Sequence, residues 1–458
     1  MNHEQEEYNQ RFGLCLECNQ PNICKNWCKE CNSKRFQQNF GKWTSGNEYI
    51  DKFIQEAQLE AKDRWELLEW IPYTRLRNIE FFAQGGFSTV YRGEWLDGRI
   101  DHWDYEKQEW KREIYEINKK TYNVNNPNIK NPLKSNENYV YPVVLKSLND
   151  SSNVNDDFLY EWKIHLQCQY KARSYGSLMI PLYGITQDPD TLNYMIVMHE
   201  ALGSLRNNLL TIKYNPNDKF RWLYNISLQL KAIHKLNLVH GDFHSGNILN
   251  IYHGISVISD LGLCKLVNQS STNGEIYGVL PYIAPEVLRG RPYTKAADIY
   301  SLGIIMWEMT SGVPAFHDIP HNFHLSLDIC KGVRPKIIEG TLPEYAELMK
   351  RCWDDDPKKR PTAKELLIIF DEWDDKYQKE NDDKKRIPIP EHIPEIIIYH
   401  PESCYISKKI DYSTKLSRDD ELSGRIDIDD LDNYDITIYK TNVIENLDEC
   451  LAKNLNIK

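Results

Sequence analysis

The alternation of apolar and polar residues predicts an isolated helix near the start of the chain. Between residues 46 and 71, apolar residues recur at mostly helical spacing, which is typical of an amphipathic helix. Ser45 or Asn47 is expected to cap the start of this helix, and Pro72 is expected to close it. The helix therefore leads directly into the segment that follows.

Strand-like and helical patterns occupy different parts of the remaining chain. Short strand-like runs come first, at residues 81–91 and 141–148, and helical patterns prevail from about residue 218 onward. This order predicts an α+β fold with two lobes, in which a β-rich lobe precedes a helical lobe. We expect the two-lobed domain to extend over residues 77–375.

Two polar segments interrupt or follow this domain. Residues 97–140 form a long insertion, in which IDHWDYEKQEWKREI has the pattern of a hairpin and NVNNPNIKNPLKSNEN is expected to be flexible. Residues 378–458 contain an acidic stretch and isolated apolar residues without a sustained period. They predict a mostly disordered acidic tail.

Charge and hydropathy exclude some classes of function. The formal net charge is −11, so broad electrostatic attraction to nucleic acid or to an anionic membrane is not expected. The first ten residues lack the apolar core of a signal peptide, and no run of apolar residues is long enough to span a bilayer. The expected compartment is the cytoplasm, and nuclear access stays open.

Five of the eleven cysteines fall within a short segment near the start of the chain. In a reducing compartment, such clustering favours a metal site over a disulfide framework. Two CxxC pairs with nine residues between them predict a structural zinc site that has no open position. The four expected ligands lie in a module at residues 10–35: Cys15, Cys18, Cys28 and Cys31.

Two questions about this cysteine module stay open. The segment can instead carry free thiols, and Cys24 can lie outside the site or replace one ligand. If metal binds, the closed site suits a structural role or the binding of a protein partner rather than catalysis.

A series of short motifs carries candidate chemistry, in an order and spacing that coincidence does not explain. In chain order they are the loop FFAQGGFSTVYRG, Lys146 in VVLK, Glu161 on a predicted helix, Asp242 five residues before Asn247, Asp260 in VISDLGL, Glu286 in YIAPE, Asp298 in DIYSLG and Arg360 in DPKKRP. Together these motifs resemble those of the eukaryotic protein-kinase family, and the resemblance covers about two thirds of the chain.

The resemblance implies a reaction and a role for each matching residue. Lys146 is expected to contact the ATP phosphates and Glu161 to hold that lysine, while Asp242 orients the acceptor hydroxyl. Asn247 and Asp260 are expected to bind Mg²⁺, which prefers hard oxygen ligands. The remaining nucleotide-binding positions are Ala83, Gly85, Gly86 and Ser88 in the phosphate loop, Val90, Val144 and Leu249 around the adenine, Met198 as gatekeeper, and the backbone of Glu200 and Ala201.

The overall motif pattern is most similar to the tyrosine-kinase-like branch, which implies transfer to serine and threonine hydroxyls of proteins in signal transduction. Four positions depart from the family pattern: Ala83, Ser88, Gly241 and His244. Gly241 stands where an arginine usually receives an activating phosphate, and His244 stands where a lysine usually steadies the γ-phosphate. These departures motivate an alternative, a pseudokinase or scaffold that binds ATP or partners without useful transfer.

Overall fold

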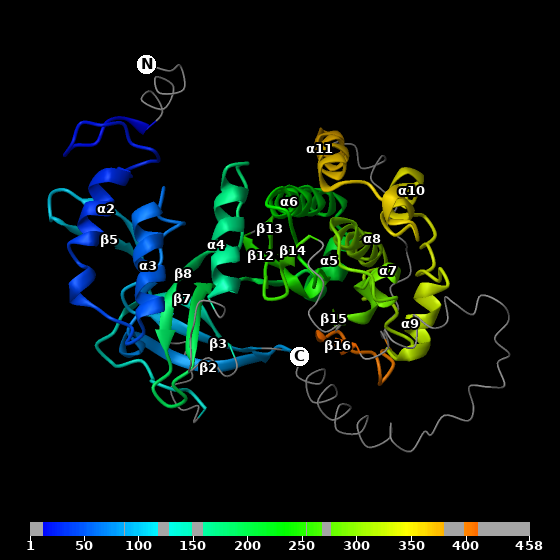
Figure 1. Ribbon diagram of the computed structural model, residues 1–458, viewed down its shortest axis with the longest axis horizontal. Coiled ribbons are helices and arrows are strands. Elements are labelled where there is room, and N and C mark those ends of the chain that lie inside the picture. The colour runs from blue at the N-terminus through cyan, green and yellow to red at the C-terminus, as the bar shows by residue number, and fades with distance from the viewer. Residues whose placement is uncertain are drawn as a thin grey trace. The chain divides into compact units, whose positions relative to one another are not determined.

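The structure is a computed structural model that describes residues 12–86, 88–117, 128–148, 159–252, 254–267, 276–379 and 398–410 (Figure 1). The chain divides into two compact units, Met1–Ala201 and Leu202–Lys458. We call them the N-terminal unit and the C-terminal unit and describe each by itself. The first is rich in strands and the second in helices, so the predicted α+β fold with a β-rich and a helical lobe is confirmed.

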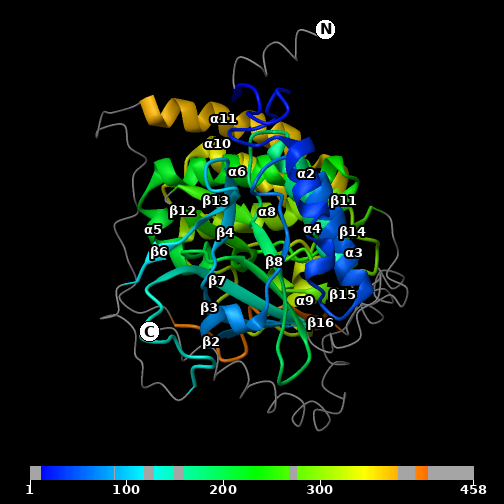
Figure 2. The ribbon, with the colours of Figure 1, turned by 90° about the vertical axis from the view of Figure 1, so that its left-hand side faces the viewer.

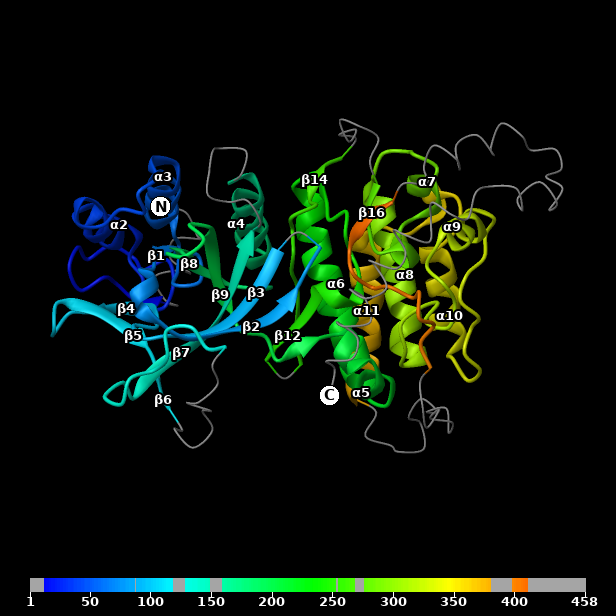
Figure 3. The ribbon, with the colours of Figure 1, turned by 90° about the horizontal axis from the view of Figure 1, so that it is seen from below.

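A seven-stranded sheet forms the centre of the N-terminal unit (Figure 3). Its order is β1-β8-β9-β7-β3-β2, with β6 also paired to β7, and only the pairing of β1 with β8 is parallel. Valine, tyrosine and leucine dominate β7, which suits a central strand. The strands are β1 (Glu69–Trp70), β2 (Leu76–Gln84), β3 (Ser88–Trp95), β6 (Tyr115–Glu116), β7 (Tyr139–Leu148), β8 (Leu182–Gln187) and β9 (Tyr194–His199).

The predicted amphipathic helix is present as α3 (Glu48–Glu60), and Asn47 caps it by accepting the backbone N–H groups of Tyr49 and Ile50. The prediction that the helix continues to residue 71 is wrong. The chain leaves the helix at Ala61, where Asp63 and Glu66 accept nearby backbone N–H groups. These side chains compete with the helical hydrogen-bond ladder and turn the chain.

Helix α3 is part of the core of the N-terminal unit. Its apolar face packs on α4 (Tyr160–Arg173), the helix that carries Glu161. Trp162 lies against Phe53 in this contact, and the connection after α3 is tied to the other end of α4 by an ion pair between Asp63 and Arg173. The core cluster that joins the two helices includes Ile50, Phe53, Ile54, Ala57, Leu68, Leu159, Trp162 and Leu166.

The first part of the insertion forms the predicted hairpin, with strands β4 (Arg99–Asp104) and β5 (Glu109–Glu113). The hairpin packs on the cysteine module, whose helix α2 (Lys29–Gln37) lies beside α3 (Figures 1 and 2). Trp110 stacks on Phe36 at a ring-centroid distance of 4.7 Å and on Trp27 at 6.1 Å. The insertion therefore has a structural partner in the same chain.

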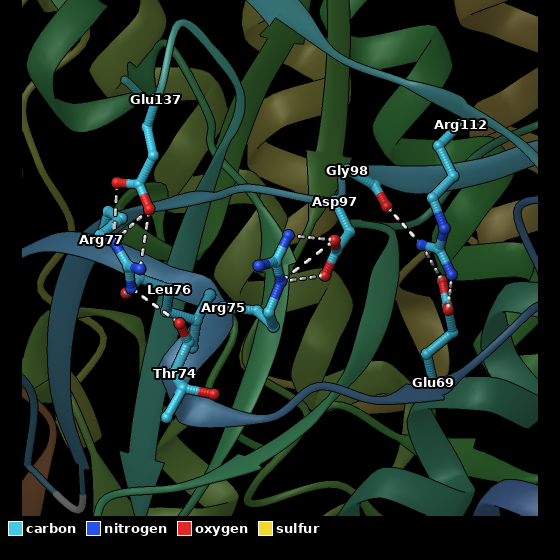
Figure 4. A network of polar contacts seen from close by, with 9 residues as sticks. All are labelled: Glu69, Thr74, Arg75, Leu76, Arg77, Asp97, Gly98, Arg112 and Glu137. Carbon is cyan, nitrogen blue, oxygen red and sulfur yellow. Dashed lines mark hydrogen bonds and ion pairs between the residues drawn. The ribbon is translucent and has the colours of Figure 1, made fainter. Parts of the chain in front are cut away.

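The second part of the insertion departs from its prediction. Residues 128–138 are not a free loop, because Lys130 forms a β-bridge with Ile79 and Glu137 forms an ion pair of 2.8 Å with the buried Arg77 (Figure 4). A buried arginine needs such a partner, which explains why this polar stretch is held against β2. Residues 123–127 of the same prediction lie outside the described residues.

The C-terminal unit is built around α8, which is buried along almost its whole length. Its small strands form three separate sheets: β10-β12-β13, β11-β14 and β15-β16. The helices are α5 (Leu209–Lys213), α6 (Pro216–Lys235), α7 (Pro285–Leu288), α8 (Lys295–Ser311), α9 (Phe323–Cys330), α10 (Pro343–Cys352) and α11 (Ala363–Lys379). The strands are β10 (Gly203–Ser204), β11 (Leu238–Val239), β12 (Ile248–Tyr252), β13 (Ile255–Ile258), β14 (Lys265–Leu266), β15 (Ile276–Gly278) and β16 (Lys408–Ile410).

The prediction of a disordered tail is wrong for residues 398–410. Residues 398–410 lie on the C-terminal unit, where β16 pairs with β15 and Ile410 is buried. Residues 380–397 and 411–458 lie outside the described residues. Within the parts of the chain that the structure describes, no helix is both long enough and apolar enough to cross a membrane.

Candidate active site

The N-terminal unit holds the predicted lysine and glutamate. Lys146 lies on β7, where it is flanked by Val90 of β3 and Ile196 of β9. Its Nζ is 3.1 Å from Oε1 of Glu161 in the first turn of α4. The central strand and the packed helix thus bring the two side chains together as predicted.

The phosphate-loop residues form the turn between β2 and β3. Ala83 pairs with Val90, and the Gly85 N–H donates to the Ser88 carbonyl at 2.7 Å, which closes the turn. A Cβ on Gly85 would lie 3.2 Å from the Ser88 hydroxyl, so the turn accepts a larger residue there only if a neighbour moves. Gly86 lies in the same turn.

The predicted adenine-binding residues are divided between the two units. Val144 and Met198 are paired on neighbouring strands, and Ala201 ends the N-terminal unit. Glu200 forms an ion pair of 2.9 Å with Arg92, and burial raises the pKa of the Glu200 carboxyl. Leu249 lies on β12 of the C-terminal unit.

The C-terminal unit holds the predicted acceptor side of the site. The Asn247 side chain donates to the Asp242 carbonyl at 3.0 Å, which directs its amide oxygen away from this bond. Asp298, which is almost fully buried, accepts the backbone N–H groups of His240 and Gly241 at 2.9 and 3.2 Å. These bonds fix the backbone immediately before Asp242.

Asp260 is held close to this loop through the residue before it. The Ser259 N–H and hydroxyl both donate to the Asn247 carbonyl, at 2.9 and 3.0 Å. Asp260 itself has a φ of +57°, a conformation that non-glycine residues adopt infrequently and that often marks a functional site. An amide oxygen and a carboxylate held this way have the donor chemistry that Mg²⁺ requires.

Gly241 has a backbone requirement that the family comparison alone does not indicate. Its φ is +77°, and a Cβ would lie only 2.7 Å from the Leu263 carbonyl oxygen. A side chain at this position therefore requires the loop to move. The backbone of this loop therefore requires glycine at position 241, where the family usually has an arginine.

His244 is oriented by Arg206, a residue that the sequence motifs do not single out. Its Nδ1 accepts hydrogen bonds from Arg206 and from the Gly246 N–H, both at 3.1 Å. The ring N–H at Nε2 therefore faces Asp242, with 3.7 Å between Nε2 and Oδ2. Burial lowers the pKa of His244, so this residue presents a neutral donor to the carboxylate at neutral pH.

Glu286 and Arg360 form the expected buried pair. Two hydrogen bonds of 2.7 Å join them, and the Arg360 side chain is fully buried. Bidentate geometry makes this a strong and specific ion pair. It fixes the start of α7 to the segment before α11.

The four predicted zinc ligands form a compact cluster in the N-terminal unit. Their sulfur atoms all lie within 4.8 Å of one another, with 3.8 Å between Cys15 and Cys31 and 3.5 Å between Cys18 and Cys28. Tetrahedral zinc with bonds of about 2.3 Å separates its sulfur ligands by about 3.8 Å, so the cluster fits that metal. Cys24 is not part of the cluster.

The thiols of this cluster differ in their affinity for protons. Burial raises the pKa of Cys15, but hydrogen bonds from Tyr105 and the Cys18 backbone outweigh it and lower the pKa to about 7. Burial raises the pKa of Cys28 to about 11. Four thiolates held this close repel one another, and a divalent cation removes that repulsion.

The fold, the Lys146–Glu161 pair and the loop that carries Asp242 and Asn247 together define a protein kinase. Residues 76–370 match the family described as protein tyrosine and serine/threonine kinase, which is more than half of the chain. The chain therefore belongs to this kinase family.

Similar curated proteins bear serine/threonine-kinase names. R831 of Acanthamoeba polyphaga mimivirus, provisionally named a serine/threonine-protein kinase/receptor, is 34% identical over 40% of this chain and 12% of its own length. The serine/threonine-protein kinases STY17 and STY46 of Arabidopsis thaliana are 29% and 28% identical, over 32% and 36% of this chain and 26% and 29% of their own lengths. The chain thus spans less than a third of each of these relatives.

Proposed function

We propose that this chain is an active, ATP-dependent protein kinase that phosphorylates serine and threonine residues of other proteins in signal transduction. The observation that carries the proposal is the 3.1 Å contact between Lys146 and Glu161, because a kinase must form this pair to hold the phosphates. The serine/threonine names of the similar proteins support the choice of acceptor, and the motif pattern supports the tyrosine-kinase-like branch. We place its action in the cytoplasm.

In this proposal each polar residue has one task. Lys146 neutralises charge on the α- and β-phosphates, and Asp242 orients the acceptor hydroxyl and receives its proton. Asn247 and Asp260 would hold Mg²⁺, which supplies positive charge against the phosphate oxygens. The neutral His244 lies beside Asp242, with 3.7 Å between Nε2 and Oδ2, at the position where the family usually has a lysine.

The nucleotide is bound mainly by small and apolar groups. Ala83, Gly85, Gly86 and Ser88 let the loop backbone approach the phosphates, since none of these side chains is large. Val90, Val144 and Leu249 enclose the adenine, with Met198 as gatekeeper, and the backbone of Glu200 and Ala201 provides its hydrogen bonds.

A transfer assay distinguishes this proposal from the pseudokinase alternative. Purified protein is incubated with radiolabelled ATP, Mg²⁺ and a generic protein acceptor, beside an Asp242→Asn variant. Label on serine or threonine that disappears in the variant supports the kinase. Nucleotide binding without transfer would support a scaffold instead, and label on tyrosine would contradict the assigned acceptor.

We also propose that the cysteine module binds one structural zinc ion. The distances between the sulfur atoms support this. The packing of the hairpin over the module also supports it, because a metal would fix the segments that hold Trp27 and Phe36 against Trp110. Metal analysis of the purified chain is expected to give about one zinc per chain, from a site with four thiolate ligands. Cys18→Ser should lose the zinc, whereas Cys24→Ser should retain it; equal zinc content in both would refute the assignment.

The closed site leaves the module free to contact a protein partner, which is the third part of the proposal. The module would then select a protein substrate while the kinase site acts on it. A variant with altered exposed module residues should phosphorylate a generic peptide normally and fail to select its protein substrate.

A further inference from the structure

One end of strand β15 lies beside the residue proposed to orient the acceptor hydroxyl. A Cβ on Gly278, the last residue of β15, would lie 3.5 Å from Oδ1 of Asp242. Addition of an extended peptide to a strand edge is a common way of recognising a peptide, because the backbone supplies the hydrogen bonds and alternate side chains supply the specificity. A peptide that pairs with β15 at Gly278 therefore passes beside Asp242.

The chain's own residues 398–410 occupy this edge. Strand β16 pairs antiparallel with β15, in a register that places Lys408 opposite Gly278 (Figure 1). Residues directly opposite each other in an antiparallel pair have their Cβ atoms on the same face, about 5 Å apart. The Lys408 side chain therefore leaves the strand pair on the face toward Asp242. It carries an ammonium group where a protein acceptor carries a hydroxyl.

Tyr405 anchors the segment three residues before Lys408. Its hydroxyl donates to the Ala315 carbonyl at 2.8 Å, and its ring meets that of His321 edge-on at a ring-centroid distance of 4.8 Å. Arg206 donates to the Tyr405 carbonyl at 2.8 Å and lies over the same ring at 5.1 Å. Together these contacts select a tyrosine, because the hydroxyl and the ring each have a partner.

Ile410 anchors the segment two residues after Lys408. It is 3% exposed and is paired with Ile276, which is 4% exposed. A shift of the pairing by one residue would turn Ile410 to the opposite face of the strand, so its burial fixes the register. Lys408 itself is exposed, so another side chain fits there without repacking the core.

We propose that the edge of β15 binds the acceptor peptide and that residues 398–410 occupy it as a built-in pseudosubstrate, with Lys408 at the acceptor position. This inference rests on the proposed kinase function and names its substrate class. The acceptor is an extended peptide with serine or threonine in place of Lys408, tyrosine three residues earlier and isoleucine two residues later. While the segment is docked, it excludes such peptides, and its release makes β15 available to them.

Release of the segment is tested on the full chain with ATP, Mg²⁺ and a generic protein acceptor. Ile410→Asp places a charge at the buried anchor, whereas Ile398→Asp changes a side chain of the same segment that is 76% exposed. Ile410→Asp should raise transfer to the generic acceptor by about tenfold or more, because burial of one isoleucine shifts a docking equilibrium by at least this factor. Ile398→Asp should leave the rate unchanged, and a synthetic peptide with the sequence of residues 398–410 should inhibit the released variant.

Lys408→Ser tests the acceptor position and keeps both anchors. The hydroxyl oxygen at position 408 should form a bond to the γ-phosphorus of ATP, while the bond from that phosphorus to the β,γ-bridging oxygen breaks. ADP then leaves with the electron pair, and the hydroxyl proton passes to Asp242. Site mapping by mass spectrometry should find phosphate at position 408, at a rate per chain that is unchanged by tenfold dilution. Adding Ile410→Asp to this variant should lower that label by about tenfold or more.

The inference is overturned if Ile410→Asp and Ile398→Asp label the generic acceptor at the same rate. It is also overturned if the Lys408→Ser variant labels the generic acceptor but carries no phosphate at position 408, or carries it at Ser407 instead. Absence of label on every acceptor in every variant would instead refute the kinase function itself, and this inference with it.

Discussion

Substitution of Ile54 tests whether the helix before the kinase domain is part of its core. Ile54 is fully buried between α3 and α4. Ile54→Ala removes three carbon atoms, each worth about 0.8 kcal/mol of transfer free energy, and leaves a cavity. We expect the free energy of unfolding to fall by about 3 kcal/mol, within the range of about 2–5 kcal/mol measured for such changes in buried sites.

The change should also reduce phosphotransfer, because α4 carries Glu161. Urea unfolding followed by tryptophan fluorescence measures the stability, and the transfer assay measures the activity at the same temperature. Ile54→Val removes one carbon and should cost about 1 kcal/mol. Ile368→Ala, at an exposed position on α11, should stay within about 0.5 kcal/mol of the unaltered chain.

The reasoning is refuted if Ile54→Ala unfolds at the same urea concentration as Ile368→Ala. If Ile54→Ala is destabilised but transfers phosphate at the unaltered rate, the predicted link between α3 and the position of Glu161 is refuted. In that case α3 is packed, but the position of Glu161 does not depend on it.

Three other substitutions test the C-terminal unit. Asp242→Asn should lower the transfer rate by roughly 10²–10⁴-fold in a steady-state assay without changing the melting temperature, because it removes the proton acceptor; an unchanged rate would remove Asp242 from the mechanism. Glu286→Ala leaves the buried Arg360 without its partner and should cost about 3–5 kcal/mol in denaturant unfolding, more than Glu286→Gln; equal losses would contradict the ion-pair argument. Burial, together with the charges of Lys408 and Arg206, lowers the pKa of His321 to about 4, although hydrogen bonds to the Cys404 and Phe316 backbone oppose the shift. As the pH falls, the unfolded chain therefore binds a proton on His321 before the folded chain does. The free energy of unfolding should not be reduced by this group above about pH 6.5, and it should fall by at most about 3 kcal/mol toward pH 4. His321→Gln should flatten that part of the pH profile.

Much of the fold and of the site could be predicted from local sequence. The order of strand and helix patterns gave the two lobes, and the motif spacing gave Lys146 and Glu161 as neighbours, which a distance of 3.1 Å confirms. The hairpin in the insertion was also predictable, because its alternating pattern is local. Signals of this kind need only a few adjacent residues.

The features that sequence did not predict depend on contacts between distant residues. The end of α3 at Glu60 is set by side chains that capture backbone groups, and residues 128–138 are held by the need of Arg77 for a carboxylate. The order of residues 398–410 depends on Arg206, about two hundred positions earlier. Nothing in the local sequence distinguishes these partner residues from other polar residues.

The stacking of Trp110 on Phe36 also has a consequence for how the chain is made. More than seventy residues separate the two rings along the sequence, and ribosomes add about 5–20 residues per second. The cysteine module therefore leaves the ribosome several seconds before the hairpin that covers it. During that interval its thiols and aromatic side chains are open to solvent, so early capture of a metal would protect the nascent chain from oxidation and aggregation.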